Sequence, residues 1–182
     1  ASFDAAAWYP IASGAALATQ LSATVVAGAL ADWKGPRVVL LSGLALFAVG
    51  LVVCAAGSHV TIFVIGRALQ GLGGGLLIVP LYVLVGAVAS ARHRPSFFAS
   101  FSLAWVLPSL VGPAIAGHVT EVWGWRYVFG VVPLFVAIAA VPIAYVLRSL
   151  PTAQGQRSPV LAALSRDAGL VGVGVMALQL AG

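Results

Sequence analysis

The sequence predicts an all-α fold, a polytopic membrane bundle in which about five helices cross the bilayer. Two features of its composition indicate this class: 62% of the residues are hydrophobic and only 7% are charged, where soluble domains carry about 25% charged residues. The third observation is a pattern in which long uncharged runs alternate with short basic segments. An apolar run of about 20 residues crosses the hydrocarbon core as a helix. The 182 residues therefore leave no room for a sizeable soluble domain.

The net charge of +5 does not indicate a nucleic-acid partner, because the basic residues lie in short loops between apolar runs. Membrane topology accounts for that placement, so no nucleic acid is expected. Spans are expected at residues 6–30, 38–57, 61–88, 96–118 and 127–147, followed by a polar linker at 149–167 and the start of a further helix at 168–182.

The first expected span carries polar side chains within its apolar run. Gln20 and Thr24 are one helical turn apart and so share a face. Small polar groups in a membrane either hold helices together or line a cavity for a substrate. The sequence leaves both roles open.

A short charged segment separates the first two spans. Gly35 and Pro36 predict a tight turn, because glycine ends helices and proline fixes φ for the next one. Asp32 lies where its carboxylate can meet a helix N-terminus or an arginine. Lys34 and Arg37 add positive charge, which indicates a cytoplasmic loop.

The second span is almost wholly aliphatic and contains Cys54, the only cysteine. A lone cysteine forms neither an internal disulfide nor a cysteine cluster for a metal, so we expect a small buried residue there. Polar interruptions concentrate instead in the first, third and fourth spans. This contrast predicts that those three helices surround a cavity and that the second and fifth lie at the periphery.

The third span contains Arg67 in an otherwise uncharged run. An arginine at the bilayer centre costs about 2.5–3.5 kcal/mol on insertion scales, so such residues usually face a cavity or a partner. The alternative is a side chain that snorkels back to the interface. Gln70 and Gly71 follow one turn later on the same face. Pro80 predicts a kink or an end of the regular helix.

The fourth span follows the basic segment 92–94, which is again expected on the cytoplasmic side. Trp105, Ser109 and Gly112 share a helix face that offers an aromatic wall beside a hydroxyl and a groove. Together with Gln20 and Thr24, we expect Trp105 and Ser109 to line a substrate cavity.

The distribution of basic residues predicts the orientation without any further information. Arg67 lies within the membrane and Arg126, in an aromatic girdle before the fifth span, lies outside. The other seven of the nine Lys and Arg residues are expected on the cytoplasmic side: Lys34, Arg37, Arg92, Arg94, Arg148, Arg157 and Arg166.

No arrangement typical of an enzyme appears in the sequence. Ser, His and Asp do not group at motif spacing, and neither a carboxylate pair nor a set of metal ligands is present. The glycines after Arg67 do not continue as a dinucleotide or phosphate loop. We therefore expect no cofactor and no metal.

Two segments resemble motifs found throughout the major facilitator superfamily of transporters. The first resembles the signature between the second and third helices of that family, with Pro36 where a basic residue is usual: Gly28-x-Leu30-Ala31-Asp32-x-x-Gly35-x-Arg37. The second resembles the fourth-helix motif whose arginine is implicated in proton transfer: Arg67-x-x-Gln70-Gly71.

Two further segments resemble the drug:proton antiporter branch of the same family. The fifth-helix antiporter motif is matched in part, with Pro108 and Ala116 in two of its glycine positions, by Gly112-Pro113-x-x-x-Gly117. Residues 121–129 resemble the aromatic segment that opens the sixth helix in those antiporters.

The resemblance implies a partial major facilitator fold. Residues 1–148 would be the N-terminal transmembrane half without its first helix, residues 149–167 the cytoplasmic link between the halves, and residues 168–182 the start of the next transmembrane helix. The implied roles are gating for Gly28, Leu30, Asp32, Gly35 and Arg37, proton coupling for Arg67, Gln70 and Gly71, and the antiporter motif for Gly112, Pro113 and Gly117.

The function implied is secondary-active, proton-coupled efflux of lipophilic drug-like compounds by alternating access. The implied partners are a small-molecule substrate, protons, the lipid bilayer, and the first helix and C-terminal half of the same protein. The implied location is a plasma membrane, expected to be a bacterial inner membrane. Two alternatives stay open: a family member that carries a sugar, metabolite or lipid, and a membrane scaffold that transports nothing.

Overall fold

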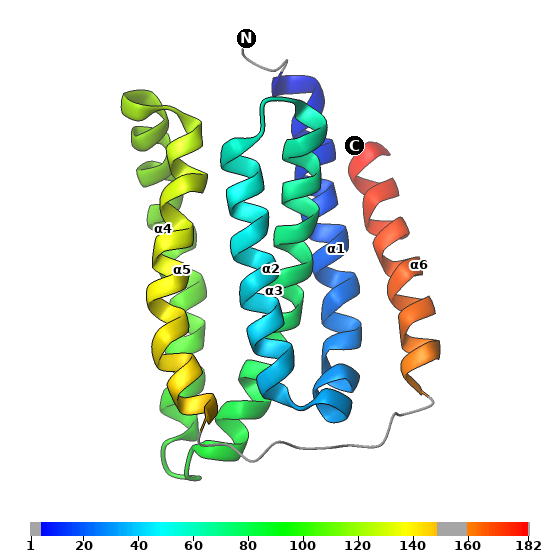
Figure 1. The fold of residues 1–182 in the computed structure, drawn as a ribbon, viewed down its shortest axis with the longest axis vertical. Coiled ribbons are helices and arrows are strands. Elements are labelled where there is room, and N and C mark those ends of the chain that lie inside the picture. Colours follow the sequence, from blue (N-terminus) through cyan, green and yellow to red (C-terminus); the bar gives the residue numbers. More distant parts are fainter. Residues whose placement is uncertain (1–4, 149–159, 182) are drawn as a thin grey trace.

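The computed structural model describes residues 5–148 and 160–181. Within these residues every element is a helix, and successive helices run in opposite directions along the molecule (Figure 1). In chain order they are α1 (Ala5–Lys34), α2 (Pro36–Ala56), α3 (Val60–Val88), α4 (Arg94–Trp123), α5 (Trp125–Arg148) and α6 (Val160–Ala181).

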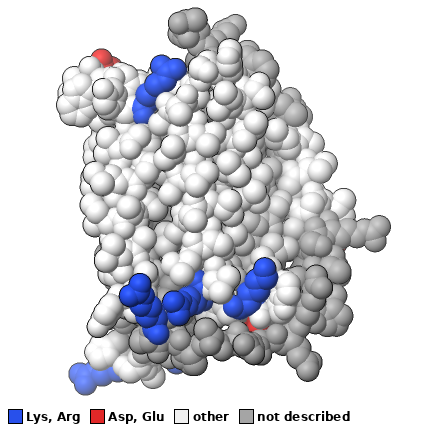
Figure 2. All heavy atoms as spheres, in the orientation of Figure 1, with Lys and Arg blue, Asp and Glu red and all other residues white. Residues whose placement is uncertain are grey.

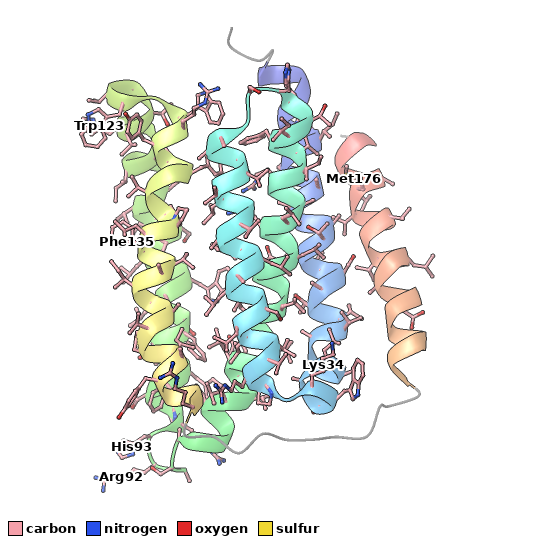
Figure 3. All side chains as sticks on the ribbon, in the orientation of Figure 1. Lys34, Arg92, His93, Trp123, Phe135 and Met176 are labelled. Carbon is pink, nitrogen blue, oxygen red and sulfur yellow. The ribbon has the colours of Figure 1, made fainter. Side chains whose placement is uncertain are left out.

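The first five helices are each long and apolar enough to cross a membrane. This confirms the predicted all-α, multi-pass fold. The helix α6 contains a shorter apolar stretch, Asp167–Leu178. On the outer surfaces of α4 and α5, large apolar side chains such as Phe135, which is 63% exposed, point away from the other helices (Figure 3). Such surfaces suit contact with lipid.

Two details of the helices differ from the sequence-based expectations. The sixth helix begins at Val160, so residues 160–167 of the expected linker are helical. The reason is local: the apolar residues that follow Pro159 are mostly good helix formers. Residues 149–159 of the linker lie outside the described residues. The helix α3 also continues past Pro80, which is fully buried against its neighbours.

Glycines set the two shortest connections. Only Gly35 separates α1 from α2, and only Gly124 separates α4 from α5. Their φ angles are +84° and +94°, a region that side chains with a Cβ rarely adopt. Pro36 then opens α2 at a position where its missing N–H costs nothing. The predicted tight turn between the first two spans is confirmed.

The basic segments lie at one end of the bundle, as predicted. Lys34, Arg92 and His93 are at the lower end in Figure 3, whereas Trp123 is at the opposite end. Basic side chains also gather at the lower end of the surface in Figure 2, and the upper end shows a single basic group beside an acidic one. The basic segments that were expected to share one side of the membrane thus share one end of the bundle.

The helix α3 packs closely on both α1 and α2, and these three helices form the core. Glycines on two sides of α3 make this possible. A Cβ added to Gly66 or Gly73 would meet the backbone of α2, and one added to Gly71 or Gly75 would meet the backbone of α1. Close approach of this kind is typical of membrane helices, which associate through small residues.

The remaining helices are added to the edges of this core. The helix α5 packs on α2, α6 packs on α1, and α4 packs mainly on α5 with slight contact to α3. Several residues of α2, among them Cys54 as predicted, are buried, whereas α4 has none. The expected grouping of the first, third and fourth spans is therefore not observed within the described residues. Instead α2 is the second neighbour of α3, because the glycines of α3 let the two backbones approach closely.

Candidate functional site

Arg67 lies on the side of α3 between its contacts with α1 and α2. Its two chain neighbours show this. A Cβ on Gly66 would meet Sγ of Cys54 on α2 at 2.7 Å, and the carbonyl oxygen of Ala68 accepts a hydrogen bond from Thr19 on α1 at 2.9 Å. Arg67 thus follows a residue that packs on α2 and precedes one whose carbonyl oxygen is bonded by α1.

The guanidinium of Arg67 is held by its own helix. Its Nη1 donates a hydrogen bond to Oε1 of Gln70 at 2.5 Å, and both side chains are half-buried. A charged hydrogen bond of this kind is strong in a region of low dielectric constant. Because a guanidinium has five N–H donors, Arg67 can still bind a second acceptor, such as a carboxylate.

Gly71 is a point of close packing between α3 and α1. A Cβ at this position would clash with the carbonyl oxygen of Ala16 and with the hydroxyl of Thr19, both on α1. Gly71 thus sets the distance between α1 and α3, whereas Arg67 and Gln70 supply the polar groups. The sequence predicted that all three residues share one face of the helix. In the structure Gly71 lies against α1, whereas Arg67 and Gln70 bind each other.

Gln20 and Thr24, the two residues of α1 expected to line a cavity, lie at its interface with α3. Thr24 donates to the carbonyl oxygen of Gln20 at 2.8 Å, and its hydroxyl lies 3.5 Å from the carbonyl oxygen of Gly75. The Gln20 side chain lies 3.8 Å from the position that a Cβ on Gly74 would occupy. Gln20 is thus on the same side of α3 as Arg67, two helical turns further along.

The expected gating residues lie at the end of the bundle that carries Lys34 and Arg92. Gly28 packs against Val79 of α3, and Leu30 is half-buried in the same helix. Asp32 is exposed in the last turn of α1, where the helix dipole disfavours a negative charge. Within the described residues no ion pair joins it to Arg37.

The helix α4 presents its expected site residues outward. Trp105 is 60% exposed, and the exposed Ser109 donates only to the carbonyl oxygen of Val106 in its own helix, at 2.8 Å. A Cβ on Gly112 or Gly117 would meet nothing within 4 Å, and Pro113 between them is exposed. Since α4 makes no contact with α1, the structure does not bring Trp105 and Ser109 to Gln20 and Thr24.

A cluster at the outer end was not expected from the sequence. Arg126 donates a hydrogen bond from Nη2 to the carbonyl oxygen of Gly57, just past the end of α2, at 3.3 Å, and its guanidinium lies 4.8 Å from the Trp125 ring centroid. Phe63 of α3 makes edge-on contacts with Trp125 and Phe129 at 5.6 and 5.3 Å. The aromatic composition indicated an interface but could not identify these partners.

No described residues form a group of three or more His, Cys, Asp or Glu side chains that could hold a metal ion. Three acids are in the described part: Asp32 and Glu121 lie in the last turns of α1 and α4, and Asp167 begins the apolar stretch of α6. Arg67 is thus the one described charge in the middle of a spanning helix.

These features define a multi-pass helical membrane protein with an arginine held inside one of its spans. The model of the Major Facilitator Superfamily matches residues 1–178, and the chain belongs to that family. It is a family of transporters rather than of enzymes.

Several proteins of known name are similar to the chain. The multidrug transporter protein MdtP of Bacillus subtilis is 32% identical over 144 residues, which are 79% of this chain and 26% of MdtP. A probable multidrug-efflux transporter of Mycobacterium tuberculosis is 35% identical over 126 residues, 69% of this chain and 27% of that protein. The efflux pump dotC of Dothistroma septosporum is 32% identical over 129 residues, 71% of this chain and 22% of the pump. The chain thus spans about a quarter of the length of these relatives.

Proposed function

We propose that this chain is part of a secondary-active transporter that exports lipophilic drug-like compounds in exchange for protons by alternating access. The single observation that carries the proposal is the Arg67 guanidinium, held by Gln70 within a membrane-spanning helix. The names of the three relatives, two multidrug transporters and an efflux pump, favour efflux over uptake of a sugar, metabolite or lipid.

Arg67 would act on a carboxyl group from another part of the full-length protein. Placing a lone charge in a span is costly, so it is retained where it has a partner or a task. A carboxylate that reaches Arg67 forms an ion pair with it, whereas the neutral acid accepts only a weaker hydrogen bond. Approach to the guanidinium would therefore favour release of the proton, which couples proton movement to the motion of helices.

The cytoplasmic loop would control that motion. Asp32 at the end of α1 and Arg37 at the start of α2 would form their ion pairs across the cytoplasmic face in only one state of the cycle. The remaining gating residues fix the loop: Gly35 gives the turn its backbone angle, and Gly28 packs on α3. We place this end of the protein at the cytoplasmic side of a plasma membrane, in a bacterium the inner membrane.

The test uses the full-length protein in proteoliposomes with a pH-sensitive dye inside. An imposed substrate gradient should move protons, and Arg67→Ala should lower that flux by about tenfold or more, the worth of one charged hydrogen bond. Arg67→Lys keeps the charge but loses the fork of donors, so it should recover only part of the flux. Arg92→Ala, in the exposed loop, is the control and should transport normally.

Other results would overturn the proposal in distinct ways. Substrate movement without protons in every variant would contradict proton coupling. Movement of a sugar or metabolite but of no lipophilic compound would contradict drug efflux. A protein that folds and assembles normally but moves no solute, with Asp32→Asn and Arg67→Ala indistinguishable from wild type, would be a scaffold.

A further inference from the structure

Thr19 of α1 contacts α3 directly beside Arg67. Its hydroxyl donates to the carbonyl oxygen of Ala68, the residue after Arg67, at 2.9 Å. It shares its hydrogen with the carbonyl oxygen of Ala15 in its own helix, at 2.8 Å. Another hydroxyl of α1, that of Thr24, is 3.5 Å from its acceptor in α3. The contact made by Thr19 is the closer of these two.

The Thr19 hydroxyl also lies in the space that the missing side chain of Gly71 leaves open. A Cβ on Gly71 would clash with this oxygen and with the carbonyl oxygen of Ala16. Ala68 and Gly71 are three residues apart in α3, so they lie on the same side of the helix. One oxygen atom of α1 is thus bonded to Ala68 and packed against Gly71, and together these contacts fix the rotation of α3 at this level.

The rotation of α3 determines where the Arg67 guanidinium lies. Arg67 and Gln70, which are joined by a hydrogen bond, each precede one of the two residues that Thr19 contacts. Successive residues of an α-helix are about 100° apart around its axis. Both members of the pair therefore leave the helix at a set angle from the Thr19 contact, and any turn of α3 would displace them together.

We propose that Thr19 is a positioning residue for proton coupling: through Ala68 and Gly71 it holds α3 in the rotation that presents the Arg67 guanidinium to its carboxylate partner. This inference rests on the proposed transport function, in which Arg67 favours release of a proton from an acid elsewhere in the protein. The Thr19 hydroxyl binds the backbone of α3, so it acts on transport through Arg67. Without it the guanidinium stabilises the carboxylate less well, and the acid keeps its proton to a higher pH.

The test measures substrate-driven proton flux over a range of pH, with the full-length protein in proteoliposomes. Thr19→Ala removes the hydroxyl and Thr19→Ser keeps it, so these two variants differ by one oxygen atom. Thr19→Val, which loses the hydroxyl but keeps the branched shape, is the second variant if the alanine variant does not fold. The matched control is Thr120→Ala, because the exposed Thr120 donates to the carbonyl oxygen of Ala116 in its own helix at 2.7 Å.

We expect Thr19→Ala to lower the flux about threefold, the worth of one neutral hydrogen bond, and to move the pH midpoint of transport upward. Arg67→Ala should move the midpoint in the same direction and further. Thr19→Val should resemble Thr19→Ala, whereas Thr19→Ser and Thr120→Ala should keep the wild-type profile. In Thr19→Ala/Arg67→Ala the midpoint should equal that of Arg67→Ala alone, because no guanidinium is left to position.

The inference is overturned if Thr19→Ala leaves the pH midpoint unchanged, whether or not the flux or the unfolding temperature falls, because Thr19 would then only join two helices. It is also overturned if Thr19→Ser shifts the midpoint as far as Thr19→Ala does, or if the shifts of Thr19→Ala and Arg67→Ala add in the double variant. A wild-type midpoint in Arg67→Ala would instead overturn the proposed function, and this inference with it.

Discussion

Two glycines carry backbone angles that decide the shortest connections of the bundle. Gly35 has φ and ψ of +84° and +147°, and Gly124 has +94° and +155°. This region of the map is nearly restricted to glycine, because a Cβ collides with the backbone there. Each of these glycines is the whole connection between two helices, α1 and α2 or α4 and α5. With no longer loop between them, the two helices of each pair lie antiparallel.

Replacing either glycine by alanine should therefore destabilise the protein. We expect Gly35→Ala and Gly124→Ala each to cost about 1–3 kcal/mol, the usual strain of a non-glycine residue in this region. Thermal unfolding of the full-length protein in detergent measures the loss. Gly86→Ala is the control, since its added methyl group meets nothing within 4 Å and lies in a helix. Equal stability of all three variants would contradict these backbone angles.

At the scale of the element, α3 organises the core because its glycines lie on two sides. Gly71 meets the backbone of α1, whereas Gly74, three residues on, leaves ordinary van der Waals space, with its nearest neighbour at 3.8 Å. The same substitution at the two positions should thus have different results. Comparing the two variants distinguishes the cost of disturbing close backbone packing from the general effect of glycine on helix stability.

Gly71→Ala should destabilise the full-length protein by about 1–3 kcal/mol, because the methyl group forces α1 and α3 apart. Gly74→Ala should be neutral or slightly stabilising, since alanine is the better helix former. Both are measured by thermal unfolding in detergent. The packing described for α1 on α3 would be refuted if the variant at Gly74 were the more damaging one.

The outer ends of α2 and α5 are joined by one guanidinium. Arg126→Ala removes the hydrogen bond to Gly57 and the contact with the Trp125 ring. We expect a loss of about 1–3 kcal/mol and faster proteolysis at this end. Arg148→Ala, an exposed residue at the other end of the same helix, is the control. Identical digestion of the two variants would show that Arg126 does not hold α5.

At the scale of the whole molecule, charge and helix direction give the same orientation. Lys34 and Arg92 lie at one end and Trp123 at the other (Figure 3). In the full-length protein with all its native cysteines replaced, Trp123→Cys should react with a membrane-impermeant maleimide added to intact cells. Lys34→Cys and Arg92→Cys should react only after the membrane is permeabilised. Opposite labelling of Lys34→Cys and Arg92→Cys would contradict the arrangement of the first four helices.

Much of the fold was predictable because the bilayer imposes strict rules on a sequence. Apolar length gives the number of spans, and basic loops give the orientation, since each depends on composition over a short window. The turn at Gly35 was also predictable, from the local preferences of glycine and proline. The start of α6 was not predictable, because residues 160–167 include both good helix formers and the polar residues that are typical of a linker.

The site was predictable only in part. Arg67 was identified by its cost in a membrane, and its hydrogen bond to Gln70 follows from their spacing along one helix. The grouping of helices did not follow from polarity: α2, nearly all aliphatic, is in the core, and α4, rich in polar interruptions, has no buried residue. Membrane helices pack through small residues rather than through a hydrophobic force, so polarity does not predict their neighbours.

By itself the sequence determined the class of protein, its spans and the residue that carries an unusual charge. These are properties of single segments in a given solvent. Only the tertiary structure decided which helices touch, that Gly71 spaces α1 from α3, and that Ser22 reaches Ala168 across 146 positions of the chain. Such contacts depend on the relative rotation of helices, which is determined by the shape of both surfaces together and by neither sequence segment alone.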